Sequence, residues 1–562
     1  MPVERSTTTP TAGARRSKAQ RLLRDALAGL TLAAITIPEQ MATAKLGGFE
    51  PQIGFFAFIG ATVGFALAGT NRILTTGADS TITPIFAGSL ALLAASGPDT
   101  LVASAVALAL LVSVALIVAG LLRLGWIADL LSTPIVTGFL AGIAFHIVAS
   151  QLPDALGIPL QSSSTFDRLS GVYVHVRDAN PWSIAIAAGV LALTLATEKI
   201  NPRLPGALVA VALATLAVLL FSLEDKGVAV LGTLPSGLPR PVVPAWDIDT
   251  LRQLVPLALI LALVVMMQTA AVSRSFSDPS RLSTDVNRDF IGVGVANLGA
   301  ALLGSFPVNA SPPRTAVVHA AGGTSQIGVL ISAAIVAALA IGGGDTLKHV
   351  PQAALAGVLL FVAVRIVRIR IIDAVARQAP GEFALILLTA GAVIVLPIPT
   401  GVAIGISLSL LHGVWITTQT RVSEFTNVPG TTIWWPSNGT PGESRPNVLV
   451  VGFQAPLLFA NADTFRRGMR AIIAARQPLS LVVLEGGGIA DIDFTAAEAL
   501  RDVIAECRAQ HIEFAIARLV SVRALAALEQ FGILSELGAG HVFHSVAEAI
   551  AAAMPDDAKG KA

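Results

Sequence analysis

The stretch GSFPVNASPPRT, residues Gly304–Thr315, separates two apolar segments and guides the interpretation of the whole chain. It holds the adjacent prolines Pro312 and Pro313 and one cation, Arg314. A cation at membrane depth costs about 2.5 to 3.5 kcal/mol on insertion scales, so it is expected to face a partner or a watery cavity. The prolines fit the first turn of a helix. The amides of that turn, its positive end and Arg314 would then form an anion site in a broken membrane helix.

An ordinary loop is the alternative, with Arg314 at the bilayer surface and the prolines marking a turn. Composition favours the membrane site. The chain has 562 residues, of which 54% are hydrophobic and 13% charged, and its mean hydropathy is +0.74. These values predict a polytopic α-helical membrane protein. A net charge of +1 gives no reason to expect a nucleic-acid partner, and one cysteine, Cys507, excludes an internal disulfide framework.

The chain is predicted to begin with a disordered cytoplasmic tail, 1–20, followed by a transmembrane transport domain, 21–422. Fourteen spans are predicted near 26–45, 52–69, 79–95, 101–121, 128–150, 182–197, 205–222, 252–273, 289–304, 311–320, 326–342, 352–366, 380–396 and 399–419. The third and tenth are too short or too polar for complete helices, so each is predicted as an extended piece followed by a half-helix. Clustered Lys and Arg place both termini in the cytoplasm, with the chain in the inner (plasma) membrane.

The two halves of this domain carry signs of an internal repeat. The offset from Glu39 to Gln268 is 229 residues, and the offset from Asp79 to Ser311 is 232. Each pair occupies corresponding positions, on the first span and on the broken span of its half. Because seven spans is an odd number, the second half is inverted relative to the first. The pattern predicts a 7+7 inverted repeat with two half-helices meeting at the midplane, as in secondary transporters.

After about residue 425 the composition changes to that of a soluble domain. We expect a linker over 423–445, a small cytoplasmic α/β domain over 446–555, and a disordered tail over 556–562. NVLVVGF, 447–453, and LSLVVL, 479–484, are typical of buried strands that are each followed by a helix.

Several pieces of the sequence resemble the SulP family of anion transporters, whose members carry a C-terminal STAS domain. AGLTLAAITIPEQMATAKLGG from Ala28 is similar to the family's first-helix signature, and DFIGVGVANLGAALLGSFPVNASPPRTAV from Asp289 to its ninth and tenth helices. FQAPLLFANADTFRRG from Phe453 and IDFTAAEAL from Ile492 resemble the STAS domain. The resemblance implies a homodimer in which core spans 1–4 and 8–11 move against gate spans 5–7 and 12–14 in an elevator-like motion.

The resemblance also implies an anion site between the two half-helices, with side chains from the first and eighth spans. Carried over to this sequence, the substrate-binding residues are Glu39, Thr43, Ala78, Asp79, Ser80, Gln268, Ala310, Ser311 and Arg314. The pair Pro38-Glu39 puts an acid where the family often has an amide, and Gln268 stands where bacterial members commonly have a glutamate. We therefore hypothesise that Glu39 couples the anion to a proton. A structural role, or an ion pair with Arg314, is the alternative.

Two other polar residues leave two interpretations open. Asp79 is expected to cap the half-helix that follows it, or else to bind a cation such as sodium with help from Thr81 or Thr83. Thr495 is expected to cap a helix of the C-terminal domain in a capping box with Glu498, or else to accept phosphate, as the STAS resemblance implies.

The sequence thus predicts a secondary active transporter of small inorganic or organic anions, of the sulfate, bicarbonate or dicarboxylate class, with proton-coupled symport. An anion exchanger or uniporter is one alternative, and an anion sensor that signals through its STAS domain is another; a nucleobase transporter is less compatible with Arg314. No catalytic residues, metal ligands or cofactor are expected, so the chain is predicted not to be an enzyme. The predicted partners are the anion, a proton or sodium ion, membrane lipid and a second copy of the chain.

Overall fold

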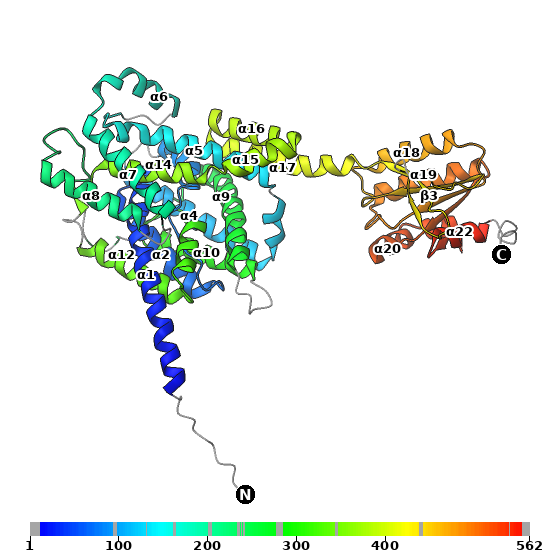
Figure 1. The fold of residues 1–562 in the computed structure, drawn as a ribbon, viewed down its shortest axis with the longest axis horizontal. Coiled ribbons are helices and arrows are strands. Elements are labelled where there is room, and N and C mark those ends of the chain that lie inside the picture. The colour runs from blue at the N-terminus through cyan, green and yellow to red at the C-terminus, as the bar shows by residue number, and fades with distance from the viewer. Residues whose placement is uncertain are drawn as a thin grey trace, which may run out of the picture. The chain divides into compact units, whose positions relative to one another are not determined.

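The structure is a computed structural model that describes residues 12–93, 98–130, 132–160, 165–200, 205–232, 237, 239, 242–276, 285–342, 347–437, 442–538 and 540–553. The chain divides into two compact units, Met1–Ser409 and Leu410–Ala562 (Figure 1). The predicted tail over 556–562 and residues 1–11 of the predicted N-terminal tail lie outside the described residues. The rest of that tail differs from the prediction, because the first helix already begins at Ala12.

Each of the fourteen predicted spans coincides with one helix. These helices are α1 (Ala12–Leu46), α2 (Pro51–Ala68), α3 (Thr83–Leu93), α4 (Pro98–Leu121), α5 (Thr133–Leu156), α7 (Pro181–Ile200), α8 (Gly206–Phe221), α9 (Ile248–Ser275), α10 (Val286–Leu302), α11 (Pro312–Ala320), α12 (Gln326–Gly342), α14 (Gln352–Ile366), α16 (Pro380–Val395) and α17 (Ile398–Thr418). Within the described ranges, six helices are at least 18 residues long and apolar enough to cross a membrane, namely the main part of α4 together with α2, α5, α7, α9 and α17. Four shorter apolar helices are α3, α8, α12 and α16.

Some elements of the first unit were not predicted as spans. The 3-10 helices η2 (Leu124–Leu130) and η3 (Val176–Asp178) and the helices α6 (Thr165–Val174) and α15 (Ile369–Gln378) lie between them. These four elements are short, and α6, η3 and α15 have no buried residues. None of them changes the order of the fourteen segments.

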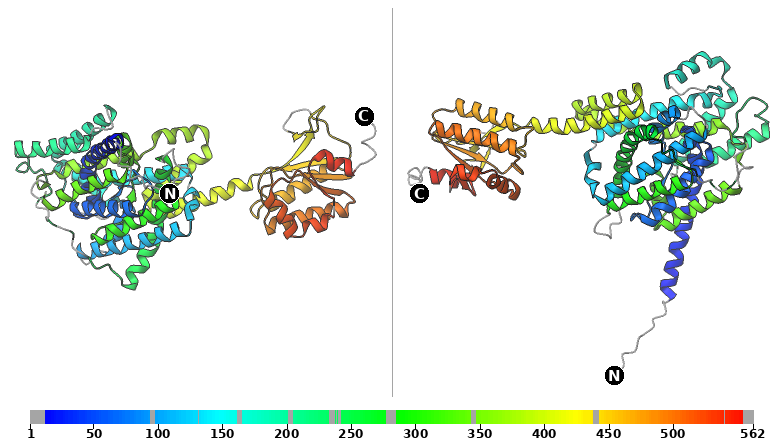
Figure 2. Two further views of the ribbon diagram at one scale, coloured as in Figure 1. Left: turned by 90° about the horizontal axis from the view of Figure 1, so that it is seen from below. Right: turned by 180° about the vertical axis from the view of Figure 1, so that it is seen from behind.

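Packing in the first unit supports an internal repeat. Helix α4 packs on α9 and α10, while α12 packs on α1 and α2, so each half supplies a helix to the other half. In the same way α5 packs on α16 and α14 packs on α7. Such an exchange of elements between halves is expected for two intertwined repeats. Figure 1 labels these helices, and Figure 2 shows the same ribbon from two further sides.

The two halves meet most closely where α2 crosses α10. A Cβ atom at Gly60 would lie 2.3 Å from the Gly299 carbonyl oxygen, and one at Gly299 would lie 2.2 Å from the Gly60 oxygen. A Cβ atom at Gly64, one turn further along α2, would lie 2.4 Å from the Val295 oxygen. Only glycine permits these contacts, so the helix backbones touch directly and support the broken segments beside them.

The second unit is an α/β domain with one six-stranded sheet. Its strands are β3 (Val422–Asn427), β4 (Trp434–Pro436), β5 (Val448–Phe453), β6 (Leu481–Glu485), β7 (Glu513–Ala517) and β8 (Val542–Phe543), in the order β4-β3-β5-β6-β7-β8. Strands β5 to β8 run parallel. Helices α18 (Ala462–Ala475), α19 (Phe494–Ala509), α20 (Val522–Gln530) and α21 (Ile533–Leu537) share one core with the sheet, and α22 (Val546–Ala553) packs on its other face.

The predicted linker over 423–445 is wrong for residues 423–427 and 434–436, which lie in strands. Strand β3 pairs antiparallel with β5 and with β4, so these residues extend the sheet of the domain. Phe425 is buried in the core under α22. The strand was missed because its two apolar residues, Val422 and Phe425, do not alternate with polar ones as in a half-buried strand, and its register depends on β5, which lies further along the chain.

Candidate functional site

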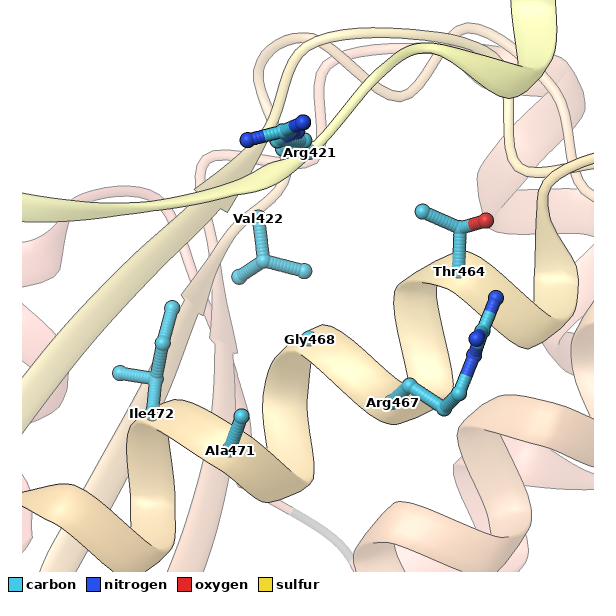
Figure 3. Close-up of a pocket in the computed structure, with 7 residues that line it drawn as sticks. All are labelled: Arg421, Val422, Thr464, Arg467, Gly468, Ala471 and Ile472. Atoms are coloured by element: carbon cyan, nitrogen blue, oxygen red, sulfur yellow. The ribbon is translucent and has the colours of Figure 1, made fainter.

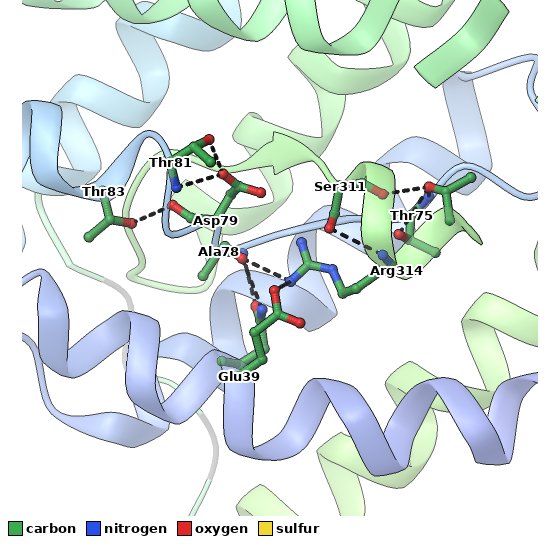
Figure 4. Close-up of polar contacts among 10 residues, drawn as sticks. Glu39, Thr75, Ala78, Asp79, Thr81, Thr83, Ser311 and Arg314 are labelled. Carbon is green, nitrogen blue, oxygen red and sulfur yellow. Dashed lines mark hydrogen bonds and ion pairs between the residues drawn. The ribbon is translucent and has the colours of Figure 1, made fainter. Parts of the chain in front are cut away.

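The two broken segments of the first unit meet at a short pair of strands. β1 (Thr76–Gly77) and β2 (Asn309–Ala310) pair antiparallel, with Thr76 opposite Ala310 and Gly77 opposite Asn309. Helix α3 follows the first strand and α11 follows the second, as the sequence predicts. Both strands are fully buried. The residues before each half-helix and the C-terminal halves of α1 and α9 therefore border one polar region. Figure 4 shows the part of it around Glu39, Asp79 and Arg314.

Arg314 lies at the centre of this region and is fully buried. Its Nη1 donates to Glu39 Oε1 at 3.2 Å and to the Ala78 carbonyl oxygen at 2.9 Å. The exposed fractions of the two charged side chains are 0% for Arg314 and 13% for Glu39. Within the part of the chain that the structure describes, Arg314 Nε and Nη2 have no hydrogen-bond partner. A buried guanidinium with unsatisfied donors is costly unless an acceptor meets it.

The first turn of α11 differs from the sequence expectation. Pro312 and Pro313 have no N–H, the Ser311 N–H donates to Thr75 O at 2.9 Å, and the Thr315 N–H donates to Ser311 O at 3.0 Å. The Arg314 N–H faces Ser311 Oγ at 3.5 Å, which caps the helix. The helix therefore offers no free amide to an anion, and its contribution is its dipole and the Arg314 side chain.

The start of α3 is organised by Asp79. Its Oδ1 accepts the Thr81 N–H at 2.9 Å and also the Thr81 hydroxyl, and its carbonyl oxygen accepts the Thr83 hydroxyl at 2.8 Å. The side-chain contact with the Thr81 N–H is that of an Asx turn directly before α3, which begins at Thr83, so the capping role expected for Asp79 stays a prediction. For the N–H groups of Asp79 and Ser80, no acceptor is found among the described residues. These amides belong to the turn before α3 and are the backbone donors of this segment that lack a partner.

Gln268 on α9 connects the two half-helices. Its Nε2 donates to Thr81 Oγ1 at 2.8 Å, and its Oε1 accepts from Asn309 Nδ2 at 2.7 Å. Because the Thr81 hydroxyl donates to Asp79, its oxygen is free to accept, so the chain of hydrogen bonds runs in one direction from Asn309 to Asp79. Gln268 is thus part of a bridge between the segments, and Asn309, which the sequence analysis did not select, is the other end of it.

Gln40 is the second residue that the sequence analysis missed. It is fully buried, and its side-chain amide pairs with both backbone polar groups of one residue: Nε2 donates to Ala78 O at 2.9 Å, and the Ala78 N–H donates to Oε1 at 2.8 Å. The Ala78 amide is therefore not available to an anion, contrary to expectation. A second polar side chain directly after Glu39 in an apolar helix was the signal that could have identified it.

The remaining predicted residues lie in the same region with smaller roles. Thr43 is buried one helical turn after Glu39, and in the described ranges its hydroxyl has no partner. Ala310 is buried in β2 opposite Thr76, whose hydroxyl also lacks a partner there. Ser80 is buried beside Asp79. The described residues hold no group of three His, Cys, Asp or Glu that could bind a metal ion.

Thr495 does not cap its helix in the second unit. Asp493 is the N-cap of α19 and accepts from the Ala496 N–H at 2.9 Å, so the predicted capping box is wrong. Thr495 is exposed in the first turn instead. Glu498, the predicted partner in the box, pairs with Arg501.

A groove of about 340 Å³ in the second unit is a less suitable ligand site (Figure 3). It is lined by Arg421, Val422, Thr464, Arg467, Gly468, Ala471 and Ile472. Its apolar side chains come from β3 and α18, and Asp463 pairs with Arg467 at 2.9 Å. A small ligand is usually fixed by buried polar groups that converge on it. The region around Arg314 has such groups, and this groove lacks them.

Comparisons with known proteins agree with this architecture. The profile of the Sulfate permease family matches residues 22–389, and that of the STAS domain matches residues 442–549. A "Probable sulfate transporter" of Mycobacterium tuberculosis is 33% identical over 532 residues, which are 94% of this chain and 94% of that protein. "Sulfate transporter 4.1, chloroplastic" of Arabidopsis thaliana is 24% identical over 512 residues, covering 88% of this chain and 74% of that protein.

Solved structures show the same fold. Murine Solute Carrier 26 family member A9, an anion transporter in the inward-facing state, matches with a TM-score of 0.87 at 19% identity, covering 98% of this chain and 96% of that chain. The transmembrane domain of the cyanobacterium bicarbonate transporter BicA matches with a TM-score of 0.61 at 20% identity, covering 70% of this chain and 97% of that domain. The predicted fold, a multi-pass membrane protein with a 7+7 inverted repeat, two half-helices and a C-terminal α/β domain, is confirmed.

The relatives are transporters and not enzymes, as the sequence predicts. The profile match covers more than half of the chain, and the Mycobacterium relative aligns along nearly all of it. The chain therefore belongs to the sulfate permease family of anion transporters, and its C-terminal unit is a STAS domain.

Proposed function

We propose that this protein is a secondary active transporter that binds a small anion at Arg314, between the two half-helices. The observation that carries the proposal is the fully buried guanidinium whose Nε and Nη2 have no acceptor among the described residues. The donors of Asp79 and Ser80 and the hydroxyl of Thr43 add to it. The names of the relatives above give sulfate and bicarbonate as the first anions to test.

Glu39 is proposed to couple this anion to a proton. Its carboxylate already neutralises Arg314 through Nη1, so an anion on the other edge of the guanidinium adds an uncompensated negative charge to a buried site. Protonation of Glu39 removes that charge and leaves Arg314 to the anion. Anion and proton then bind together, which is symport. The ion pair between Glu39 and Arg314, expected from the sequence as an alternative to coupling, is in this mechanism the interaction that couples the proton to the anion.

The moving parts are proposed to be a core of spans 1–4 and 8–11 and a gate of spans 5–7 and 12–14. The packing of α1, α2, α4, α9, α10 and α12 on one another, and of α5, α7, α14 and α16 on one another, supports this division. Lys45, on α1, bridges to Asp154 on α5 at 2.7 Å and to Gln352 on α14 at 2.7 Å. An elevator-like motion of the core has to break this bridge. A homodimer in the plasma membrane with cytoplasmic termini completes the proposal.

The test is uptake of labelled sulfate, bicarbonate and fumarate into proteoliposomes, with and without an inward proton gradient. Arg314→Ala should abolish uptake, because no other described cation lies in the site. Arg252→Ala is the matched control, because that arginine on α9 is 77% exposed and makes only a long ion pair, 3.8 Å from Nη1 to Asp249 Oδ1. Uptake without any effect of the gradient would favour exchange or uniport. Normal uptake by the Arg314→Ala protein would refute the proposed site.

A further inference from the structure

We infer that helix α15 (Ile369–Gln378) and the residue before it form a binding surface for anionic phospholipid of the cytoplasmic leaflet, with Arg368 and Arg370 holding the headgroup phosphates. The inference goes beyond the proposed function, because this surface lies outside the anion site. A lipid headgroup is chosen over a soluble phosphate compound because the surface combines cations with exposed apolar side chains.

Helix α15 is tied closely to the membrane surface. Only Val367 and Arg368 separate it from α14, and only Ala379 separates it from α16. An extended chain spans about 3.5 Å per residue, so α15 stays at the surface where these two spans end. It packs on α16 and α5 (Figure 1). Twelve predicted spans precede α15, an even number, so it lies on the side of the N-terminus, which is proposed above to be cytoplasmic.

The helix has one basic and one apolar face. Arg370 and Arg377 share one side of α15, and Ile372 lies on the opposite side. No residue of α15 is buried. Ile369 is 67% exposed, and Val364, near the end of α14, is 53% exposed. A helix with such faces lies in the membrane interface, with its apolar side among the acyl chains and its cations at the headgroups.

Two of the four arginines around α15 already have acidic partners. Arg377 Nη2 lies 2.8 Å from Asp373 Oδ1, and Arg365 pairs with a glutamate of α7. Arg368 and Arg370 are exposed, and within the described ranges neither has an ion pair. Arginine binds phosphate oxygens through parallel N–H donors. These two guanidinium groups are therefore available to a headgroup phosphate.

The STAS domain is a less suitable partner for this basic surface, because many of its acids pair with its own arginines. Arg466 Nη2 lies 2.8 Å from Asp463 Oδ1 on α18, and Glu506 on α19 pairs with Arg470. These carboxylates are not free to attract the two unpaired arginines. A leaflet that contains anionic lipid supplies negative charge along the whole helix.

The experiment measures the binding of phosphatidylglycerol and phosphatidylcholine to the purified full-length protein in detergent, by native mass spectrometry. A basic residue near an anionic membrane surface strengthens binding about fivefold, so the wild-type protein should prefer phosphatidylglycerol by about twentyfold or more. Arg368→Gln/Arg370→Gln should lose most of this preference. Arg368→Lys/Arg370→Lys should keep most of it, because both charges remain. Glycerol phosphate has the headgroup charge without acyl chains and should not compete at equal concentration.

Arg123→Gln/Arg288→Gln is the matched control, because it removes the same charge from two exposed arginines on the same side of the membrane, after α4 and at the start of α10. An unchanged preference in folded Arg368→Gln/Arg370→Gln protein would overturn the inference. So would an equal loss in the control or in the lysine variant, or full competition by glycerol phosphate. Because the assay measures lipid binding and not uptake, its result is independent of the proposed function.

Discussion

Replacing Glu39 by Gln should abolish the response of transport to pH while keeping transport itself. Glutamine can still accept from Arg314 Nη1, so the geometry at 3.2 Å is preserved and only the charge is lost. Glu39 and an anion on the opposite edge of the guanidinium lie roughly 6 Å apart. At an effective dielectric constant of about 20, two such charges repel by about 3 kcal/mol, which is about a hundredfold in affinity.

The direction of the pH effect follows from this repulsion between ionised Glu39 and the bound anion. In the wild-type protein, the anion should bind up to about a hundredfold more tightly when Glu39 is protonated than when it is ionised. The KM should therefore fall as the pH on the uptake side is lowered, and an inward proton gradient should drive accumulation. In Glu39→Gln the site is permanently in the tight-binding state, so KM should be low and flat with pH. The gradient should no longer drive accumulation.

The assay is initial uptake into proteoliposomes at several external pH values with the internal pH fixed. Glu50→Gln is the control, because that carboxyl is exposed just after α1 and should leave the profile unchanged. Asp79→Asn is a necessary second arm, since Asp79 is the other carboxyl of the region. A Glu39→Gln protein that folds and keeps the full pH response would contradict the reasoning. Loss of the response in Asp79→Asn alone would assign the proton to Asp79.

Three other predictions test the structure outside the anion site. Replacing Lys45 by Met removes a partly exposed bridge to Asp154, worth about 1 kcal/mol or less, so Vmax should change by up to about fivefold while KM stays constant in uptake kinetics. Replacing Gly299 by Leu should push α10 away from α2, because even its Cβ atom would overlap the backbone at Gly60. The melting temperature of the purified protein in detergent should therefore fall by several degrees. Burial raises the pKa of the Cys507 thiol to about 11 from 9.0. Maleimide labelling at pH 8 should therefore be about a hundredfold slower than for a free thiol. Because the pKa of this thiol is higher in the folded than in the unfolded chain, its contribution to the stability of the STAS domain is complete below pH 9 and is lost as pH rises towards 11. Denaturant titrations of the wild-type and Cys507→Ala proteins over this pH range would detect the loss.

Most of the membrane fold could be predicted because most spans are apolar segments that lipid forces into a helix. The broken segments were also predictable, since Pro312, Pro313 and Arg314 are incompatible with a continuous lipid-facing helix. Strand β3 was not, because its two apolar residues, Val422 and Phe425, do not alternate with polar ones, and its place in the sheet is defined by its partners β4 and β5. The cap of α19 was assigned two residues too late, since Asp493 and Thr495 are both good caps and only the backbone distinguishes them.

Local patterns along the chain were enough to predict that it crosses a membrane many times, that two of its segments are interrupted, and that a cation lies at one interruption. Hydropathy, proline and charge act locally, so these features could be predicted without the fold. The hydrogen bonds of Arg314 Nη1, the pairing of the Ala78 amide with Gln40, and the bridge of Gln268 from Thr81 to Asn309 became visible in the folded chain. Hydrogen bonds of this kind join residues far apart in sequence, and their partners are fixed by the positions of helices that no local pattern specifies.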